Sequence, residues 1–147
     1  MYKRQVAGNS NISGEAAQQL AAAALRSKAL KVLSGVPIEE LREDKHTSLE
    51  LREEGLGPTE GIVLAELIKF SAVLTSLDLS LNELGPEGGK AIAEALKSGK
   101  SVLTKLNVEL NYLGDAEKQL LRDAVKGRKG FKHLETGDVA TSVRYQS

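Results

Sequence analysis

The chain has 147 residues, of which 41% are hydrophobic and 3% aromatic, with no Trp and no Cys. This length suffices for one domain with an aliphatic core, and the lack of cysteine excludes disulfides, a thiolate nucleophile and a cysteine-based zinc site. The 20 Lys and Arg residues balance the 20 Asp and Glu residues, which argues against a nucleic-acid-binding or membrane-surface protein. No run of apolar residues is long enough to span a membrane.

The first five residues, MYKRQ, have two interpretations. The residues after Met1 match what a transposon-end adapter of sequencing libraries encodes in one reading frame, so residues 1–5 would be a non-native scar on a truncated frame. The alternative is a flexible basic N-terminus. Residues 11–25 follow as an Ala-rich segment, which predicts an amphipathic helix ending near Leu25, with Ile12, Ala16 and Leu20 in its apolar positions.

The next stretch, LKVLSGVPIEELREDK, occupies residues 30–45. Its apolar start predicts a short strand over residues 30–33. Residues 36–44 are predicted to form a loop or a short helix.

Three units then repeat, over residues 46–73, 74–102 and 103–130, with lengths of 28, 29 and 28 residues. Self-similarity at such a period indicates a repeat architecture. The aligned apolar positions are Leu49, Leu77 and Leu106; Leu51, Leu79 and Val108; Leu56, Leu84 and Leu113; and Leu64, Ile92 and Leu121.

Each unit predicts a strand, a turn and a helix. Alternate side chains of the strand point inward and outward. Gly-Pro at 57–58 and 85–86 starts two helices, because Pro suits the first helical turn. The predicted helices cover about 58–68, 86–97 and 115–125. His46 stands in the first Leu position of its unit, and residues 131–136 begin one further strand, before a tail over residues 137–147 that is expected to cap the edge loosely or fray.

The spacing of residues 74–84, LTSLDLSLNEL, resembles the leucine-rich repeat. The long unit, with Leu-Gly before the helix, resembles the ribonuclease-inhibitor type of intracellular proteins, and the resemblance covers roughly residues 8–135. It implies an α/β leucine-rich repeat solenoid, a short horseshoe arc with a parallel concave sheet and convex helices. It also implies a structural ladder of buried asparagines at Asn82 and Asn111, which begins late because Glu54 occupies the equivalent position.

The resemblance divides the chain after residue 5 into one repeat domain over residues 6–136 and the tail. The strand half of the first unit is missing, which favours a truncated reading frame over a flexible N-terminus. It also leads us to expect that the N-terminal face of the repeat array is open. The domain comprises a partial unit 6–29, an irregular short unit 30–45, the full units 46–73, 74–102 and 103–130, and the terminal strand 131–136.

The outward residues of successive strands predict a binding surface on the concave face, since they line up at about one strand spacing of 4.8 Å. An acidic ridge beside a small apolar strip fits a partner with a basic surface and an apolar anchor. The columns are Glu50, Asp78, Asn107 and Glu135; Arg52, Ser80 and Glu109; and Glu53, Leu81 and Leu110.

Other candidate sites are weaker. The glycine-rich stretches at 55–61 and 85–91 miss the dinucleotide and phosphate-loop spacings by one residue. His46 and His133 lie 87 residues apart without companion ligands, so we expect no metal site. The basic stretch 127–133 lacks repeated aromatic stacking partners, so we expect no nucleic-acid binding. No motif supports a catalytic residue, and no cofactor is expected.

These observations lead us to expect a non-catalytic protein–protein interaction module, a fragment of a longer intracellular repeat protein in the cytoplasm, whose oligomeric state is open. A common scaffold specifies fold better than function. The alternatives are a GTPase-regulating protein resembling Ran GTPase-activating proteins and the sensor repeats of a nucleotide-binding receptor.

Overall fold

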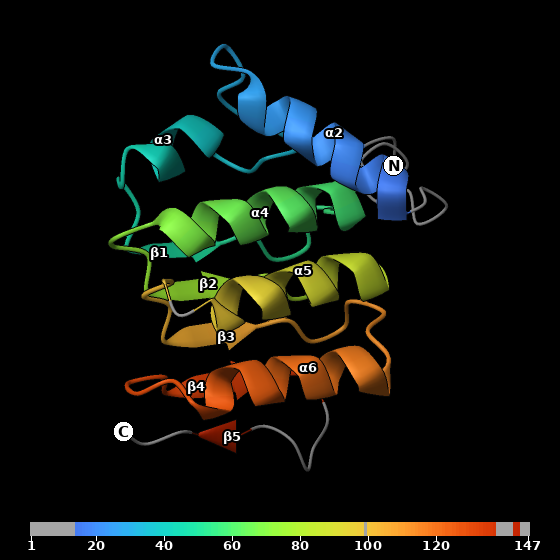
Figure 1. Cartoon of the computed structure of the whole chain (residues 1–147), viewed down its shortest axis with the longest axis vertical. Helices are drawn as coiled ribbons and strands as arrows, with labels where there is room; N and C mark the ends of the chain where they lie inside the picture. The colour runs from blue at the N-terminus through green and yellow to red at the C-terminus, as the bar shows by residue number, and fades with distance from the viewer. Residues whose placement is uncertain (1–13, 99, 138–142, 145–147) are drawn as a thin grey trace.

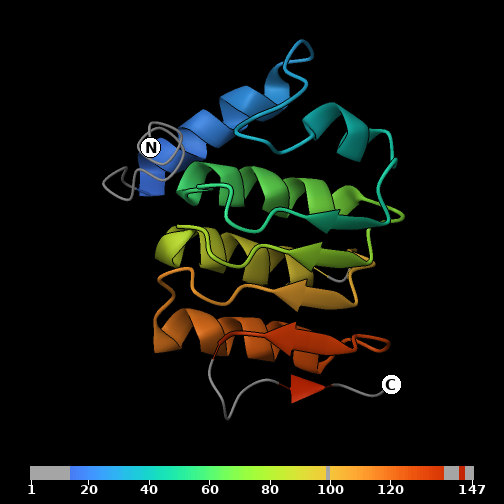
Figure 2. The same cartoon turned by 180° about the vertical axis from the view of Figure 1, so that it is seen from behind.

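The computed structural model of the chain describes residues 14–98, 100–137 and 143–144. Helices and parallel strands alternate along them as two layers, one of helices and one of strands, which confirms the predicted α/β class (Figures 1 and 2). In chain order the elements are α2 (Gly14–Arg26), α3 (Ile38–Arg42), β1 (Ser48–Glu50), α4 (Pro58–Phe70), β2 (Ser76–Asp78), α5 (Gly85–Lys97), β3 (Lys105–Asn107), α6 (Asp115–Lys126), β4 (His133–Glu135) and β5 (Val143–Arg144).

The strands form an open sheet in the order β1-β2-β3-β4-β5. Strands β1 to β4 are parallel, and their register places Leu49, Leu77, Leu106 and Leu134 side by side. Each of these leucines is buried. Residues at equivalent positions of successive units are therefore paired neighbours in the sheet. Strand β5 differs, because it pairs antiparallel with β4 and sets Val143 opposite Leu134.

Helices α4, α5 and α6 begin within one residue and end within two residues of their predicted bounds. Side chains of the first turn cap two of them: Glu60 Oε1 accepts the Gly57 N–H at 2.9 Å, and Glu117 Oε1 accepts the Gly114 N–H at 2.8 Å. These bonds satisfy donors that a helix start leaves unpaired. Glu60 is itself buried, and Ser34 Oγ donates to its other oxygen at 2.9 Å.

The spacing between α4 and α5 depends on glycine. A Cβ atom on Gly61 would lie 2.9 Å from the Gly88 Cα, and one on Gly88 would lie 3.8 Å from the Gly61 Cα. The two helices therefore approach more closely than residues with side chains would allow.

Helix α2 presents a different face to the core from the one predicted. Ala17 and Ala21 are fully buried, whereas Leu20 is 52% exposed, so the assignment of Leu20 to an apolar position is wrong. Small side chains bring α2 close to α4, and a leucine on that face would hold the helices apart. Ile12 lies outside the described residues.

Residues 30–33 do not form the predicted strand. Val32 is 56% exposed, and the segment makes only an isolated antiparallel bridge, between Leu33 and Val36. The short helix predicted within 36–44 is present as α3. Val36, Ile38 and Leu41 are buried in the same core as the leucines of the sheet.

Candidate interaction surface

The sheet register brings the first predicted column together. Glu50, Asp78, Asn107 and Glu135 are direct neighbours across four parallel strands. Glu50 is exposed and the other three side chains are half-buried. One outward row of the sheet is therefore acidic at three of its four positions.

Two members of this row also stabilise the chain that follows them. Asp78 Oδ1 accepts hydrogen bonds from the Ser80 N–H at 2.9 Å and from Ser80 Oγ at 2.7 Å. Asn107 Oδ1 accepts the Glu109 N–H at 3.0 Å. Such side-chain bonds to the backbone two residues on are typical of turns.

The second predicted column, Arg52, Ser80 and Glu109, needs a correction. Ser80 is 1% exposed, so it cannot contribute to a surface. Strand β2 ends at Asp78, and beyond it the alternation of inward and outward side chains no longer holds. Arg52 is exposed and Glu109 is half-buried.

The third column lies in the turns after the strands. Glu53, Leu81 and Leu110 all have left-handed backbone, with φ of 57°, 59° and 59°. The turns are tied to each other, because the Glu53 N–H donates to the Ser80 carbonyl and the Leu81 N–H to the Glu109 carbonyl, both at 3.0 Å. Leucine is an unfavourable residue in this region, where each such residue costs about 1–2 kcal/mol.

Two buried asparagines form hydrogen bonds with the backbone of these turns. Asn82 Oδ1 accepts the Glu54 N–H at 2.9 Å and the Leu56 N–H at 3.0 Å, while its amide donates to the Leu51 carbonyl at 2.8 Å. Asn111 repeats this in the next unit, donating to the Leu79 carbonyl at 2.7 Å. These bonds pair backbone groups that a buried turn would otherwise leave unsatisfied.

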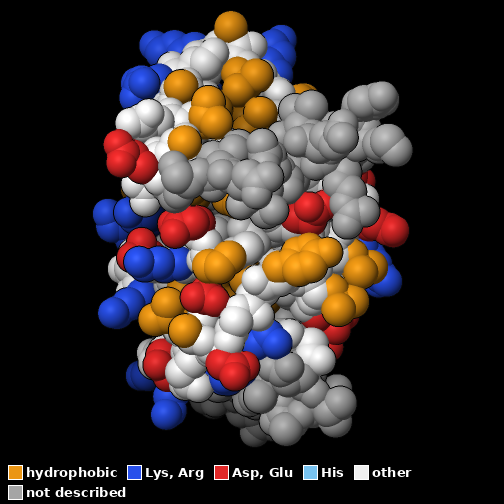
Figure 3. All heavy atoms as spheres, turned by 90° about the vertical axis from the view of Figure 1, so that its right-hand side faces the viewer, with side chains coloured by type: hydrophobic (Ala, Val, Ile, Leu, Met, Phe, Trp, Pro, Cys, Tyr) orange, Lys and Arg blue, Asp and Glu red, His pale blue; other side chains and the backbone are white. Residues whose placement is uncertain are grey.

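One surface residue was missed by the reasoning from sequence. Tyr112 is 69% exposed, has φ of 58°, and lies two positions from Leu110, which is 65% exposed. The signal that could have found it is its place directly after Asn111, where the other units carry Gly55 and Glu83. Figure 3 faces the edge where the strands end and α4, α5 and α6 begin, and shows hydrophobic and acidic side chains side by side on it.

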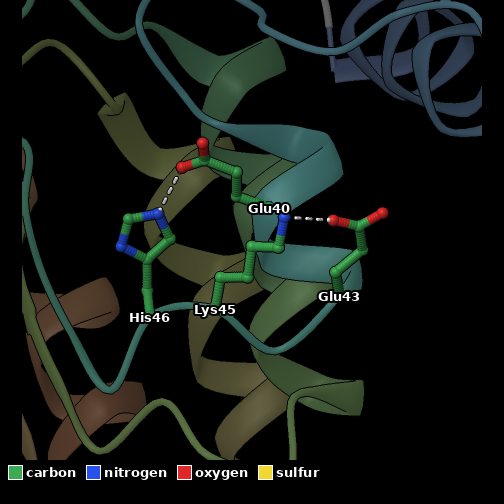
Figure 4. Close-up of polar contacts among 4 residues, drawn as sticks. All are labelled: Glu40, Glu43, Lys45 and His46. Atoms are coloured by element: carbon green, nitrogen blue, oxygen red, sulfur yellow. Dashed lines mark hydrogen bonds and ion pairs between the residues drawn. The ribbon is translucent and has the colours of Figure 1, made fainter.

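Each of the two histidine rings lies close to a glutamate carboxylate. His46 Nε2 lies 2.7 Å from Glu40 Oε1, and its ring is half-buried, unlike the fully covered Leu74 of the next unit (Figure 4). Beside it, the hydrogen bond between Lys45 and Glu43, at 3.0 Å, raises the pKa of the Lys45 ammonium. His133 Nε2 lies 3.7 Å from a Glu135 oxygen. No group of three or more His, Asp or Glu side chains that could hold a metal occurs within the part of the chain that the structure describes.

Comparison with known proteins supports a leucine-rich repeat. Residues 70–93, from the end of α4 to within α5, match the model of the leucine-rich repeat family. No curated protein sequence matches the chain significantly. Among the described residues, no helix has both the length and the hydrophobicity that a transmembrane segment requires.

Proposed function

We propose that this chain is a non-catalytic protein-interaction module of the cytoplasm, built as a short leucine-rich repeat solenoid of the ribonuclease-inhibitor type. The family match at residues 70–93 supports the repeat, and repeats of this family serve commonly in protein–protein binding. The parallel register of β1 to β4 supports an extended sheet face on which a partner could lie.

The observation that carries the proposal is the pair Leu110 and Tyr112. Both side chains are more than three-fifths exposed, so neither gains the stability of burial. Both also have left-handed backbone, which costs energy that Asn or Gly would avoid. Residues that are strained and exposed together are typical of binding sites, and Tyr is enriched among the residues that dominate interfaces.

The chemistry of the partner follows from the charges around this pair. Glu50 and Glu53 are exposed, and Glu109 and Glu135 are half-buried on the same outward surface. Arg52 is the basic residue of the predicted columns. The surface therefore fits a partner that presents Lys or Arg around an apolar or aromatic side chain, because complementary charge guides association and an apolar anchor supplies affinity.

The test replaces Leu110 and Tyr112 by Asn, which tolerates left-handed backbone and removes the apolar surface. Ligands would first be selected from a displayed peptide library against the wild-type protein. We expect enrichment of basic peptides with an apolar anchor, and at least a tenfold loss of affinity in the double variant, about 1.4 kcal/mol. Thermal unfolding should stay unchanged or shift upward, because backbone strain is relieved.

The matched control is Leu120→Asn, which removes an apolar side chain that is 43% exposed on α6. It should leave binding unaltered. Selected ligands that bind the double variant as tightly as the wild type would refute this surface. Asp78 is a poor site for such a test, because its replacement would also remove the partner of the buried Ser80 hydroxyl.

The two alternatives inferred from sequence remain predictions with their own tests. Stimulated GTP hydrolysis by a panel of small GTPases would support a GTPase-regulating protein. A nucleotide-binding domain encoded upstream of Val6 in the gene would support the sensor repeats of a receptor.

A further inference from the structure

The opposite edge of the molecule, where each helix returns to the next strand, is basic. No Asp or Glu occurs in residues 67–77, 95–108 or 124–134, the three segments that contain these returns. Figure 1 places the C-terminal ends of α4, α5 and α6 one below another on this edge. The basic edge is defined by six exposed lysines: Lys97, Lys100, Lys105, Lys126, Lys129 and Lys132.

Helix stability explains only part of this charge. Lys97 and Lys126 lie in the last turns of α5 and α6, where a cation interacts favourably with the helix dipole. Lys100, Lys105, Lys129 and Lys132 lie beyond the helix ends, and the dipole effect falls off within one turn. Interaction with the helix dipoles therefore does not explain why these four lysines lie together.

The corresponding return from α3 into β1 shows the contrast. There the Lys45 ammonium pairs with Glu43 and the His46 ring with Glu40, so the segment carries its own acidic partners (Figure 4). Arg128 is also accounted for, since its guanidinium donates to the carbonyls of Leu96 and Ser101. The six lysines of the basic edge make no ion pair within the described residues.

An exposed aromatic ring gathers two cations at one end of this edge. Phe70 is 67% exposed, and the ammonium groups of Lys69 and Lys100 each lie 5.5 Å from its ring centroid. Lys69 is also 3.9 Å from a Glu66 oxygen, whereas Lys100 has no carboxylate partner in the described residues. Two like charges held at one ring repel each other, and an anion bound beside them would relieve that repulsion.

An apolar hollow adjoins the same ring. Leu25, Leu41, Leu67 and Phe70 line it, with a volume of about 330 Å³, where the ends of α2, α3 and α4 meet (Figure 1). Arg42 also lines it and donates to the carbonyls of Leu25 and Ser27, while Glu66 adds a carboxylate already close to Lys69. Exposed apolar surface next to unpaired positive charge fits a ligand that is acidic and carries a hydrophobic side chain.

We propose that the basic edge binds an extended acidic segment of another protein, with a hydrophobic side chain of that segment in the hollow beside Phe70 and its carboxylates on the lysines. Single-stranded nucleic acid is a poorer fit, because it requires several free aromatic faces and the ring of Phe70 already carries two ammonium groups. The site is separate from the surface of Leu110 and Tyr112, so the chain would hold two partners of opposite charge.

The probe is a fluorescent peptide of alternating Glu and Asp around a central Leu-Phe pair, with a matched peptide in which Gln and Asn replace the acids. Binding to the full chain is measured by fluorescence anisotropy. We expect the acidic peptide to bind and the amide peptide not to bind. Lys100→Glu should weaken binding about fivefold, and Phe70→Ser should weaken it as well, with unchanged circular dichroism.

Lys90→Glu is the matched control, since Lys90 is exposed in the middle of α5 and its reversal changes the net charge equally. The double variant at Leu110 and Tyr112 should bind the acidic peptide normally, so this proposal can fail or hold independently of the proposed function. Equal binding of both peptides, absence of binding, or equal effects of Lys100→Glu and Lys90→Glu would overturn it. Tighter Lys100-dependent binding of single-stranded DNA or of phosphatidylserine vesicles would overturn the assignment to a protein.

Discussion

The full units and the N-terminal segment, residues 14–45, cover one hydrophobic core by different means. In the units, the same positions recur every 28 or 29 residues, and a leucine ladder across β1 to β4 is fixed by strand pairing. The N-terminal segment has no strand in that sheet. It covers the core with two alanines of α2 and three aliphatic residues around α3, namely Ala17, Ala21, Val36, Ile38 and Leu41.

This difference separates two sources of stability. A unit depends on polar bonds to its neighbour as well as on apolar burial, because its turns are buried and must be paired. The N-terminal segment depends on close packing of a few aliphatic side chains. Substitutions of each kind should therefore have effects of different size, and they can be compared by urea denaturation.

The largest effect is expected from Asn82→Ala. The substitution leaves the buried N–H of Leu56 and the carbonyl of Leu51 without the asparagine that pairs with them, whereas the Leu79 carbonyl still accepts the Asn111 amide. Each unsatisfied buried group costs about 1–3 kcal/mol, so we expect a loss of roughly 4 kcal/mol in the free energy of unfolding. Glu54→Ala, at the same position of the previous unit, is the control and should cost much less, because Glu54 is half-exposed and water can replace its contacts. Similar losses in both variants would contradict a special role for the asparagines.

A smaller effect is expected from Ile38→Ala, which tests the N-terminal segment. Ile38 is fully buried in the core that contains the leucines of the sheet. Its truncation leaves a cavity and should cost about 2–4 kcal/mol. The measurement is the unfolding midpoint together with the slope of the urea transition. If the midpoint did not move, residues 30–45 would not belong to the cooperative unit.

The smallest effect is expected from Gly61→Ala. Alanine favours a helix over glycine by about 1 kcal/mol, but the new Cβ would lie 2.9 Å from the Gly88 Cα. The helices would have to separate, and we expect a net loss of about 1–2 kcal/mol. Gly127→Ala follows α6, where an added Cβ meets nothing within 4 Å, and should be neutral. A gain in stability for Gly61→Ala would show that the contact is looser than the structure indicates.

Periodicity explains why the repeated part could be predicted. Leu74, Leu77, Leu79 and Leu84 follow from an alignment of three units, and all four are buried. The starts of α4 and α5 followed from the Gly-Pro pairs, because the fixed backbone angle of proline suits the first turn of a helix. The column Glu50 to Glu135 followed from the same alignment, because the strands pair at the same offsets of 28 or 29 residues as the aligned units.

The errors fall in the N-terminal segment, where no repeat constrains the choice, and in the turns that follow the strands. An Ala-rich helix has several faces of similar hydrophobicity, so its sequence did not reveal that Ala17 and Ala21 face the core and Leu20 does not. The segment 30–33 is apolar enough for a strand but has no neighbouring strand to pair with. The burial of Ser80 and the exposure of Tyr112 depend on how the chain turns after the strand, and residue type alone does not specify that path.

The antiparallel strand β5 has a consequence for lengthening the protein by design. A new unit appended after residue 137 would have to compete with β5 for the edge of β4. A copy of residues 74–102 inserted after Val102 would instead meet parallel neighbours on both sides, β2 before it and β3 after it. An engineer who wished to enlarge this scaffold should therefore add units in its interior and leave its last strand in place.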